Sequence, residues 1–357
     1  RLIAVCSRNK FIVILATAAA LAASAWALRH SPLDAIPDLS DTQVIVYSRW
    51  DRSPDILEDQ VTYPIVTALL GAPRVKAVRG YSDFGFSYVY VIFQDGTDLY
   101  WARSRVLEYL SKILPQLPEG VRTELGPDAT GVGWVFQYAL VDKSGRHSLA
   151  DIRSFQDWNL RYHLQSVPGV AEVASIGGFQ KQYQVQIDPN ALAAYNVPLM
   201  KVVDAIRDGN NDSGGRLVEM SGAEYMVRGR GYAKSVGDIE DIVVSKDMRG
   251  TPVLVKSLGR VVLGPEIRRG VSDLDGEGDT VGGIVVMRHG ENALKVIDRV
   301  KRKLRELQTS MPEGIEVVTT YDRSDLIEKA IATLKEELVL ELVVVSLVIL
   351  LFLWHLP

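Results

Sequence analysis

The stretch PRVKAVRGYSDFGFSYVYVIF (residues 73–93) occurs a second time, in altered form, as PGVAEVASIGGFQKQYQVQI (residues 168–187). Both copies read Pro-x-Val-x-x-Val, pass through a turn that contains glycine, and continue into an alternating strand. A second pair of segments behaves in the same way, because QLPEGVRTEL (116–125) is similar to SMPEGIEVVT (310–319) and both follow an amphipathic helix. The chain therefore contains an internal repeat, which indicates two copies of one folding unit.

The first copy is compact. Its pattern predicts, in order, a strand (42–48), a helix (53–71), a hairpin (75–81 with 87–93), a helix (98–114) and a last strand after residue 121. The second copy begins in the same way at 134–176. It closes only at 281–322, with a strand, a helix and a strand. The order β-α-β-β-α-β is the ferredoxin-like split unit.

The two halves of the second copy are separated by roughly a hundred residues, which is far more than a connecting loop needs. This segment, residues 182–270, has strand patterns of its own, one of them over residues 251–264, and a helix pattern at 198–210. We therefore expect an inserted domain there. Just after it, DLDGEGD (273–279) has acidic residues at alternate positions, but Ile284 stands where a calcium loop needs a bidentate acid. A polar turn is expected instead.

Two apolar segments lie near the ends of the chain. Phe11 to Leu28 has no charged residue and would span about 27 Å as a helix, close to the thickness of a bilayer core. Leu338 to Trp354 is apolar except for Glu341 and Ser346. A signal peptide is the alternative for the first segment. If both segments span, the positive residues before Phe11 place the N-terminus in the cytoplasm and the middle of the chain on the far side.

Several classes of function find no support in the sequence. The net charge of −4 does not suggest a nucleic-acid partner. The sequence has no GxxxxGK[ST] phosphate loop, no HExxH and no CxxC motif, so nothing reads as a catalytic centre. The five histidines and six methionines are scattered, and a single cysteine cannot form a disulfide within the chain.

Longer motifs are similar to one family of membrane transporters. They are PLDAIPDLSDTQVIV (32–46), DQVTYPI (59–65), VRGYSDFG (78–85), SYVYVIFQDGTDLYWARSRVLEYL (87–110), LGPDATGVGW (125–134), GPEIRRG (264–270) and MPEGIEVVTTYDRSDLI (311–327). Together with the two apolar segments and the interrupted repeat, they resemble the N-terminal part of a resistance-nodulation-division (RND) permease. The resemblance covers essentially the whole chain and is nearest the copper/silver subtype of the heavy-metal-efflux branch.

This resemblance implies an α+β membrane protein in which two transmembrane helices flank periplasmic ferredoxin-like (βαββαβ) porter subdomains with an inserted docking subdomain. The implied ranges are a cytoplasmic N-terminus (1–10), transmembrane helix 1 (11–28), the first porter subdomain (29–131), the second porter subdomain (133–181 and 271–321), the docking subdomain (182–270) and transmembrane helix 2 (338–354), after which the chain is truncated.

The implied function is proton-driven export of Cu(I) or Ag(I), so the protein would be a secondary active transporter rather than an enzyme. It would be a homotrimer in the bacterial inner membrane, joined to a periplasmic adaptor and an outer-membrane channel. The metal ion would be the substrate, with no cofactor. The methionine site and the acidic proton relay are expected outside this chain. Arg79 matches a family arginine that lines the periplasmic cleft, although an exposed strand charge explains it equally well.

Two alternatives remain open at this point. Thioether ligands select Cu(I) and Ag(I), whereas imidazole and carboxylate suit Zn(II), so the missing ligands would separate a monovalent from a divalent (Zn/Co/Cd) exporter. A two-span periplasmic sensor, of the chemoreceptor or kinase type, would also place an exported domain between two membrane helices. An interrupted ferredoxin-like repeat has no evident purpose in such a sensor.

Overall fold

The structure is a computed structural model, and it describes residues 8–30, 34–246, 250–268 and 270–353. The chain forms two compact units. Unit 2 comprises His147–Ser154 and Gly177–Asp279, and unit 1 comprises the rest of the described chain.

Unit 1 begins, after its first long helix, with a module of alternating strands and helices. The elements of this first module are β1 (Gln43–Arg49), α3 (Pro54–Leu57), η1 (Glu58–Thr62), α4 (Tyr63–Leu70), β2 (Val75–Asp83), β3 (Phe86–Phe93), α5 (Leu99–Ile113), η2 (Leu114–Gln116) and β4 (Arg122–Leu125). The sheet order is β2-β3-β1-β4, and all pairs are antiparallel. This is the β-α-β-β-α-β arrangement that the repeat predicts.

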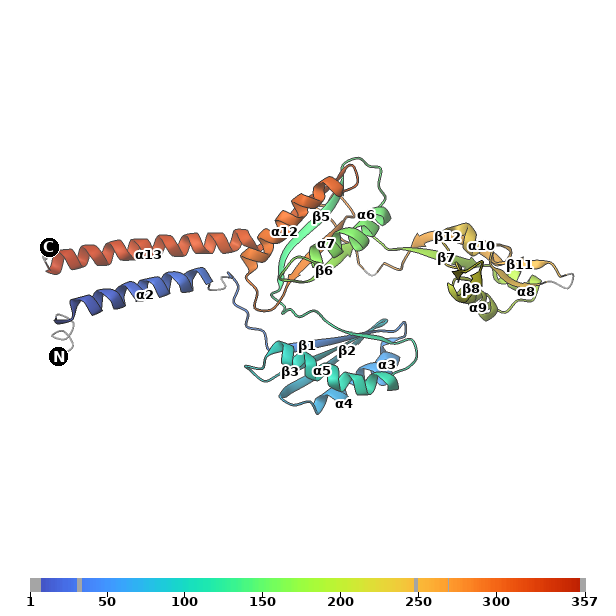
Figure 1. Ribbon diagram of the computed structural model, residues 1–357, viewed down its shortest axis with the longest axis horizontal. Coiled ribbons are helices and arrows are strands. Elements are labelled where there is room, and N and C mark those ends of the chain that lie inside the picture. Colours follow the sequence, from blue (N-terminus) through green and yellow to red (C-terminus); the bar gives the residue numbers. More distant parts are fainter. Residues whose placement is uncertain (1–7, 31–33, 247–249, 269, 354–357) are drawn as a thin grey trace. The chain divides into compact units, whose positions relative to one another are not determined.

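The helices of the first module pack on one face of its sheet (Figure 1). Alternate residues of β1, namely Val44, Val46 and Ser48, are buried on that face, as strand geometry requires. They meet fully buried helix residues such as Leu57 and Val106. Burying a side chain of this kind stabilises the fold by about 1.5–3 kcal/mol. The other face of the sheet carries no helix of this module.

The first helical segment departs from the sequence prediction in one respect. A continuous helix was expected over 53–71, but residues Glu58–Thr62 form a π-helical turn between α3 and α4. Such a turn accommodates one extra residue and changes the direction of the side chains that follow. Here it brings the hydroxyl of Thr62 into the core, where it contacts Ser82 and Ser87 at 2.7 Å each.

A second module has the same topology but is interrupted. Its elements are β5 (Trp134–Asp142), α6 (Leu149–Phe155), η3 (Gln156–Leu160), α7 (Arg161–Gln165), β6 (Val170–Gly177), β13 (Val281–Met287), α12 (Ala293–Leu307), η4 (Gln308–Ser310) and β14 (Ile315–Asp322). The sheet order is β14-β5-β13-β6, which repeats the order of the first sheet. Helix α12 buries Val296, Val300 and Leu304 at helical spacing. The two halves thus close one sheet although a long segment separates them in the sequence.

Unit 2 holds the inserted segment. Its elements are β7 (Lys181–Ile187), α8 (Pro189–Tyr195), α9 (Leu199–Gly209), β8 (Ser213–Met220), β9 (Ala223–Gly229), α10 (Val236–Glu240), β10 (Val243–Lys246), β11 (Pro252–Leu254), α11 (Val255–Leu258) and β12 (Gly259–Pro265). Its core includes Val202, Val255 and Leu258. The stretch expected as one strand at 251–264 is divided by the short helix α11, because Val255 and Leu258 turn into this core.

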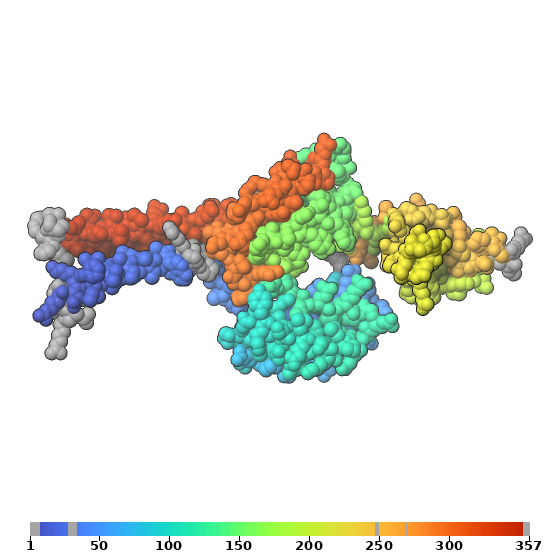
Figure 2. All heavy atoms as spheres, viewed as in Figure 1, coloured from blue at the N-terminus to red at the C-terminus, as the bar shows by residue number. Residues whose placement is uncertain are grey.

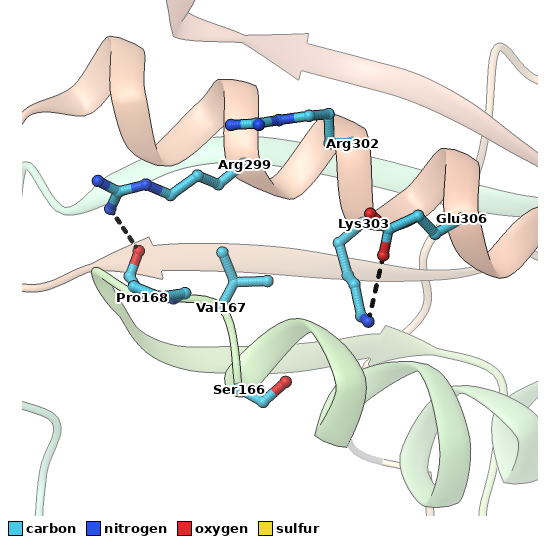
Figure 3. Close-up of a pocket in the computed structure, with 7 residues that line it drawn as sticks. All are labelled: Ser166, Val167, Pro168, Arg299, Arg302, Lys303 and Glu306. Carbon is cyan, nitrogen blue, oxygen red and sulfur yellow. Dashed lines mark hydrogen bonds and ion pairs between the residues drawn. The ribbon is translucent and has the colours of Figure 1, made fainter.

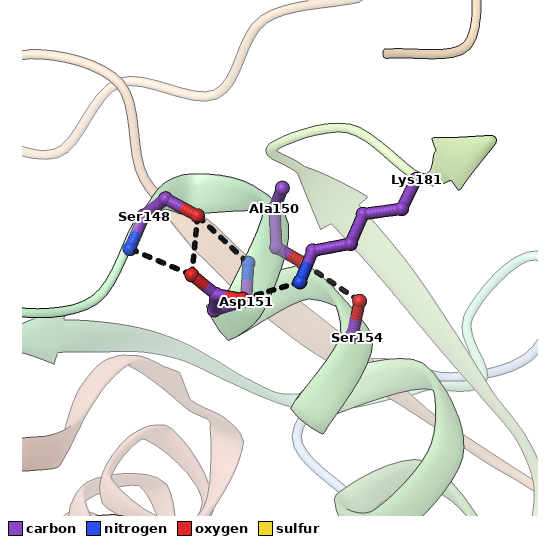
Figure 4. Close-up of polar contacts among 5 residues, drawn as sticks. All are labelled: Ser148, Ala150, Asp151, Ser154 and Lys181. Atoms are coloured by element: carbon purple, nitrogen blue, oxygen red, sulfur yellow. Dashed lines mark hydrogen bonds and ion pairs between the residues drawn. The ribbon is translucent and has the colours of Figure 1, made fainter. Parts of the chain in front are cut away.

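The inserted segment leaves and returns on a two-stranded ribbon, in which β7 pairs with β12 from Lys181↔Pro265 to Ile187↔Gly259. The start of β7 is tied to α6 by a polar cluster (Figure 4). Asp151 and Ser148 cap the helix reciprocally, with Ser148 Oγ donating to the carboxylate at 2.5 Å, and Lys181 forms an ion pair with the same carboxylate. Arg153 also donates to the carbonyl of Gly177 at 2.6 Å.

A hairpin of β8 and β9 stands on the surface of unit 2, where it is drawn in yellow (Figure 2). Every residue of both strands is exposed, including Leu217, Tyr225 and Met226. Its two-residue turn has Ser221 at φ 54° and Gly222 at φ 76°, the left-handed pair of a type I′ hairpin.

Two long helices stand at the ends of unit 1, α2 (Lys10–His30) and α13 (Arg323–Leu353). Among the described residues, α2 alone is long and apolar enough to cross a membrane, over Lys10–Ala27. The last eighteen described residues of α13 include three glutamates, so that stretch does not meet the same criterion. Its apolar side chains from Leu338 to Phe352 are nevertheless exposed. Trp354, the end of the expected second span, lies outside the described residues.

Candidate functional site

Arg79, the residue that the sequence singles out, lies in the middle of the edge strand β2 and is exposed. Its neighbour Gly80 faces the helices, because a Cβ there would lie 2.6 Å from Thr62 Cγ2 and 3.1 Å from Val66 Cγ2. Since successive side chains of a strand point to opposite faces, Arg79 lies on the face without helices. No hydrogen bond or ion pair of its side chain occurs within the described part of the chain.

Arg79 shares this open face with a group of aromatic side chains. It pairs across the sheet with Tyr90, and Tyr81 pairs with Tyr88. The rings of Tyr81 and Tyr88 are 6.3 Å apart, and those of Phe86 and Tyr88 are stacked at 6.1 Å. On β1, the guanidinium of Arg49 lies 5.9 Å from the centre of the Phe86 ring. The open face is therefore an aromatic surface that carries fixed positive charges.

One carboxylate on the open face is engaged with a tyrosine. The hydroxyl of Tyr47, on β1, donates to Glu124 Oε2 of β4 at 2.7 Å. Burial, reinforced by this hydrogen bond and by the negative charge of Glu124, raises the pKa of Tyr47 to about 12. The phenol therefore stays neutral at physiological pH and holds the carboxylate in place at the far edge of the sheet from Arg79.

The opposite side of the same sheet contains a row of hydroxyl groups that the sequence prediction missed. One Ser or Thr from each strand lies at matching register: Thr123 (β4), Ser48 (β1), Ser87 (β3) and Ser82 (β2). Ser48 and Thr123 are 2.9 Å apart, and Thr62 bridges Ser87 and Ser82. Ser82 in turn donates to Glu58 at 2.5 Å. Aligning the hairpin around Phe84-Gly85 could have revealed the Ser82–Ser87 pair, but nothing in the sequence placed Thr62 beside it.

The described residues do not assemble a site for a resident metal ion. No three His, Cys, Asp or Glu side chains gather in a suitable arrangement in the described chain. The methionines differ in their surroundings: Met226 is exposed on β9 of unit 2, whereas Met287 is buried on β13 of unit 1. A thioether site for a soft metal requires several sulfur atoms that converge.

A basic cavity of about 340 Å³ lies between α12 and the turn Ser166–Pro168 (Figure 3). Arg299 donates to the carbonyl of Pro168 at 2.9 Å, and Lys303 forms an ion pair with Glu306 at 3.4 Å. Arg302 pairs with Asp298 at 2.9 Å. Lys303 and Arg302 are thus each paired with a carboxylate, whereas Arg299 keeps its positive charge beside a neutral carbonyl oxygen.

A second cavity, of about 360 Å³, is lined by residues from three distant segments. Asp38 accepts a hydrogen bond from Thr130 at 2.6 Å, and His289 Nδ1 lies 3.9 Å from its carboxylate. Asp128 accepts from Tyr100 at 3.0 Å and lies 3.6 Å from Arg288. The residues that line this cavity belong to the stretch after α2, to the linker between the two modules, and to the end of β13 with the turn that follows it.

None of these groups forms the pairing of nucleophile, base and orienting residue that covalent catalysis requires. The open face around Arg79 can instead bind or repel ions through its fixed charges and can pack against another protein surface through its aromatic rings.

The chain is similar to known proteins in both sequence and structure. Residues 3–357 match the sequence profile of the AcrB/AcrD/AcrF family. The chain is 52% identical over 348 residues to "Cation efflux system protein CusA" of Escherichia coli (strain K12), with 97% of this chain and 33% of the relative covered. It is 51% identical, with the same coverage, to "Putative cation efflux system protein SilA" of Salmonella typhimurium.

Another relative is more distant. "Cobalt-zinc-cadmium resistance protein CzcA" of Cupriavidus metallidurans is 36% identical over 361 residues, which covers 99% of this chain and 34% of the relative. A crystal structure described as a heavy metal efflux pump superposes with a TM-score of 0.88 at 33% identity, over 99% of this chain and 35% of that one. The chain therefore spans about a third of the length of the curated relatives it matches.

Proposed function

Because the chain belongs to the AcrB/AcrD/AcrF family, we propose that it is the N-terminal third of a proton-driven RND permease that exports Cu(I) or Ag(I). The observation that carries this proposal is the difference in identity: 52% and 51% to the relatives named CusA and SilA, against 36% to the relative named for cobalt, zinc and cadmium. Membership of a permease family removes the two-span sensor from consideration.

The family supports the expected layout in the membrane. We propose that α2 and the apolar part of α13 (338–354) cross the inner membrane as the first spans of a multi-pass protein. The exposed apolar side chains of both helices would be buried in lipid, which removes the cost of their contact with water. Glu341 lies near one end of its stretch and can reach the interface.

The two modules and the inserted segment would then lie in the periplasm. We assign the first module to the first porter subdomain (29–131), the second module to the second porter subdomain (133–181 and 271–321), and the inserted segment to the docking subdomain (182–270). As a whole, the permease would form a homotrimer and would act with a periplasmic adaptor and an outer-membrane channel.

Within this layout we assign Arg79 to the substrate pathway. Its guanidinium is exposed, is fixed on a sheet, and has no side-chain partner in the described part of the chain. A fixed positive charge beside a cation pathway sets the local potential, which alters how long an ion stays at that point. The metal ligands and the proton relay are expected in the remaining two thirds of the protein.

The test is transport by the full-length protein reconstituted in vesicles with an imposed proton gradient. We expect gradient-dependent movement of Ag(I) and Cu(I), and much less of Zn(II), Co(II) or Cd(II). Transport of divalent ions alone would move the protein to the divalent branch, and no transport of any metal would contradict the proposal. Arg79→Gln should change the transport rate, whereas Lys76→Gln, an exposed cation on the same strand, should not.

A further inference from the structure

Helix α13 begins with a buried arginine. Arg323 is the first residue of the helix, and only 4% of its side chain is exposed. A buried guanidinium requires acceptors on the protein, because it has lost those that water would supply. The neighbouring Lys301–Asp322 and Arg302–Asp298 pairs are more exposed. Arg323 is therefore unusual among the cations around the start of this helix.

Its two terminal nitrogens bind two parts of the chain that are far apart in sequence. Nη1 lies 3.2 Å from Asp34 Oδ2, and Nη2 donates to the carbonyl of Trp134 at 2.8 Å. Asp34 belongs to the stretch that follows α2, and Trp134 is the first residue of β5, which lies inside the second sheet. One side chain thus joins the start of α13 to the segment that leads from α2 and to the second module.

Both ends of this connection are fixed by further contacts. In the stretch that contains Asp34, Asp38 accepts hydrogen bonds from the hydroxyl of Thr130 at 2.6 Å and from the backbone N–H of Ser40 at 3.0 Å. On the other side, Asp322 accepts from Ser324 N at 2.9 Å and Oγ at 2.6 Å and forms an ion pair with Lys301 of α12. The beginning of α13 is therefore anchored in the second module and cannot rotate freely against it.

Helix α13 continues without interruption from Arg323 to Leu353. Thirty-one residues at 1.5 Å each make a rod of about 46 Å, which joins the buried arginine to the apolar stretch. A helix of this kind transmits a tilt or a shift along its whole length, provided that its end is fixed. The hydrogen bonds of Arg323 supply this fixed end.

We propose that Arg323 is a positioning residue that couples movement of the membrane-embedded part of α13 to the second module and to the stretch after α2. The inference rests on the proposed transport function. Arginine suits this role because its planar, permanently charged fork can hold two acceptors in different directions, whereas lysine offers a single point charge. Among the described residues, Asp34 is the only carboxylate that Arg323 contacts. The Nε of Arg323 is buried and has no hydrogen-bond partner among these residues.

The experiment uses the full-length protein in vesicles and measures metal movement and proton flux in the same preparation. Arg323→Met removes both contacts, Arg323→Lys keeps the charge, and Asp34→Asn weakens one contact only. We expect the number of metal ions moved per proton to fall about tenfold in Arg323→Met, within the usual range of coupling between sites, and less in the other two. Loss of folded protein alone would lower both fluxes and leave their ratio unchanged.

The matched control is Arg146→Met, which breaks an exposed ion pair with Glu313. The exchanged pair Asp34→Arg with Arg323→Asp should recover part of the ratio. An unchanged ratio in correctly folded Arg323→Met and Asp34→Asn proteins would overturn the inference. If Arg323→Met does not fold, the ratio of metal ions to protons measured in Asp34→Asn tests the inference.

A second readout does not depend on transport. Hydrogen exchange of backbone amides in Asp34→Asn should accelerate together in residues 34–38 and in the first turn of α13, but not in α5. If the wild type moves no metal, the proposed function fails. The exchange pattern still tests whether Arg323 couples the stretch after α2 to the start of α13. Exchange that accelerates in only one of the two segments would contradict it.

Discussion

Gly80 on β2 lies against Thr62 of η1, so closely that a Cβ at position 80 would be 2.6 Å from Thr62 Cγ2. Thr62 is fully buried and its hydroxyl is fixed by two hydrogen bonds, so it cannot move aside. We predict that Gly80→Ala destabilises the first module by about 1–3 kcal/mol, the usual effect of overpacking. The measurement is the thermal unfolding midpoint of the purified protein in detergent.

The control is Gly71→Ala at the end of α4, where a Cβ would meet nothing within 4 Å and φ is −83°. That variant should unfold at nearly the wild-type temperature. Equal midpoints for Gly80→Ala and the wild type would show that β2 can shift away from η1.

Thr62→Val keeps the shape of the side chain but removes the hydroxyl that joins Ser82 and Ser87. Because Ser87 is fully buried, it loses a partner that water cannot replace. We predict a loss of about 1–3 kcal/mol in the free energy of unfolding. Thr67→Val, five residues later on the exposed side of α4, should have an effect below about 0.5 kcal/mol. A similar effect for both variants would argue against a stabilising role for the hydroxyl row.

Tyr47 gives a prediction in alkaline solution. Its pKa is raised to about 12, first by burial and then by Glu124, from a value of 10.0. The folded state therefore holds this proton more tightly, and the resulting stability is complete below pH 10 and is lost as pH rises towards 12. The difference in unfolding midpoint between wild type and Tyr47→Phe should shrink from pH 9 to pH 11. A difference that is constant with pH would contradict the assignment.

Asp151 gives the opposite dependence in acid. The ion pair with Lys181, followed by the hydrogen bond from Ser148, lowers its pKa to about 2 from 3.8. Its contribution is therefore present above about pH 4 and is lost as pH falls towards 2. Because the pair is largely exposed, the effect is small. Asp151→Asn should lower the unfolding midpoint slightly at pH 6, and the difference from the wild type should shrink as pH falls to 2. Asp241→Asn, which breaks the exposed pair with Lys256, serves as the control.

The repeat was sufficient to predict the order of the elements in both modules, because alternation in strands such as β1 and helical spacing in α12 are local properties of the sequence. The π-helical turn at Glu58–Thr62 was not predictable, since it depends on where Thr62 finds acceptors on another strand. For the same reason α11 was missed: Val255 and Leu258 read as strand residues, and only the core of unit 2 turns them into a helix.

For the site, the sequence singles out Arg79, whose role stays a prediction, but it does not reveal the surroundings of this residue. Which face it occupies follows from Gly80 and Thr62, a contact between segments that no local pattern encodes. Arg323 stands inside the motif 311–327, but no local pattern indicates a role for it, because its partners Asp34 and Trp134 are 289 and 189 positions away. Long-range pairs of this kind appear only when the chain has folded.

The ribbon of β7 and β12 brings the two ends of the inserted segment side by side, because Lys181 pairs directly with Pro265. To the second sheet, the whole insertion is therefore equivalent to the loop of a hairpin. Since the entropy of closing a loop grows only slowly with its length, the sheet is nearly indifferent to the size of what the ribbon carries. We therefore expect the second sheet still to close when the insertion is shortened to a tight turn or exchanged for another domain.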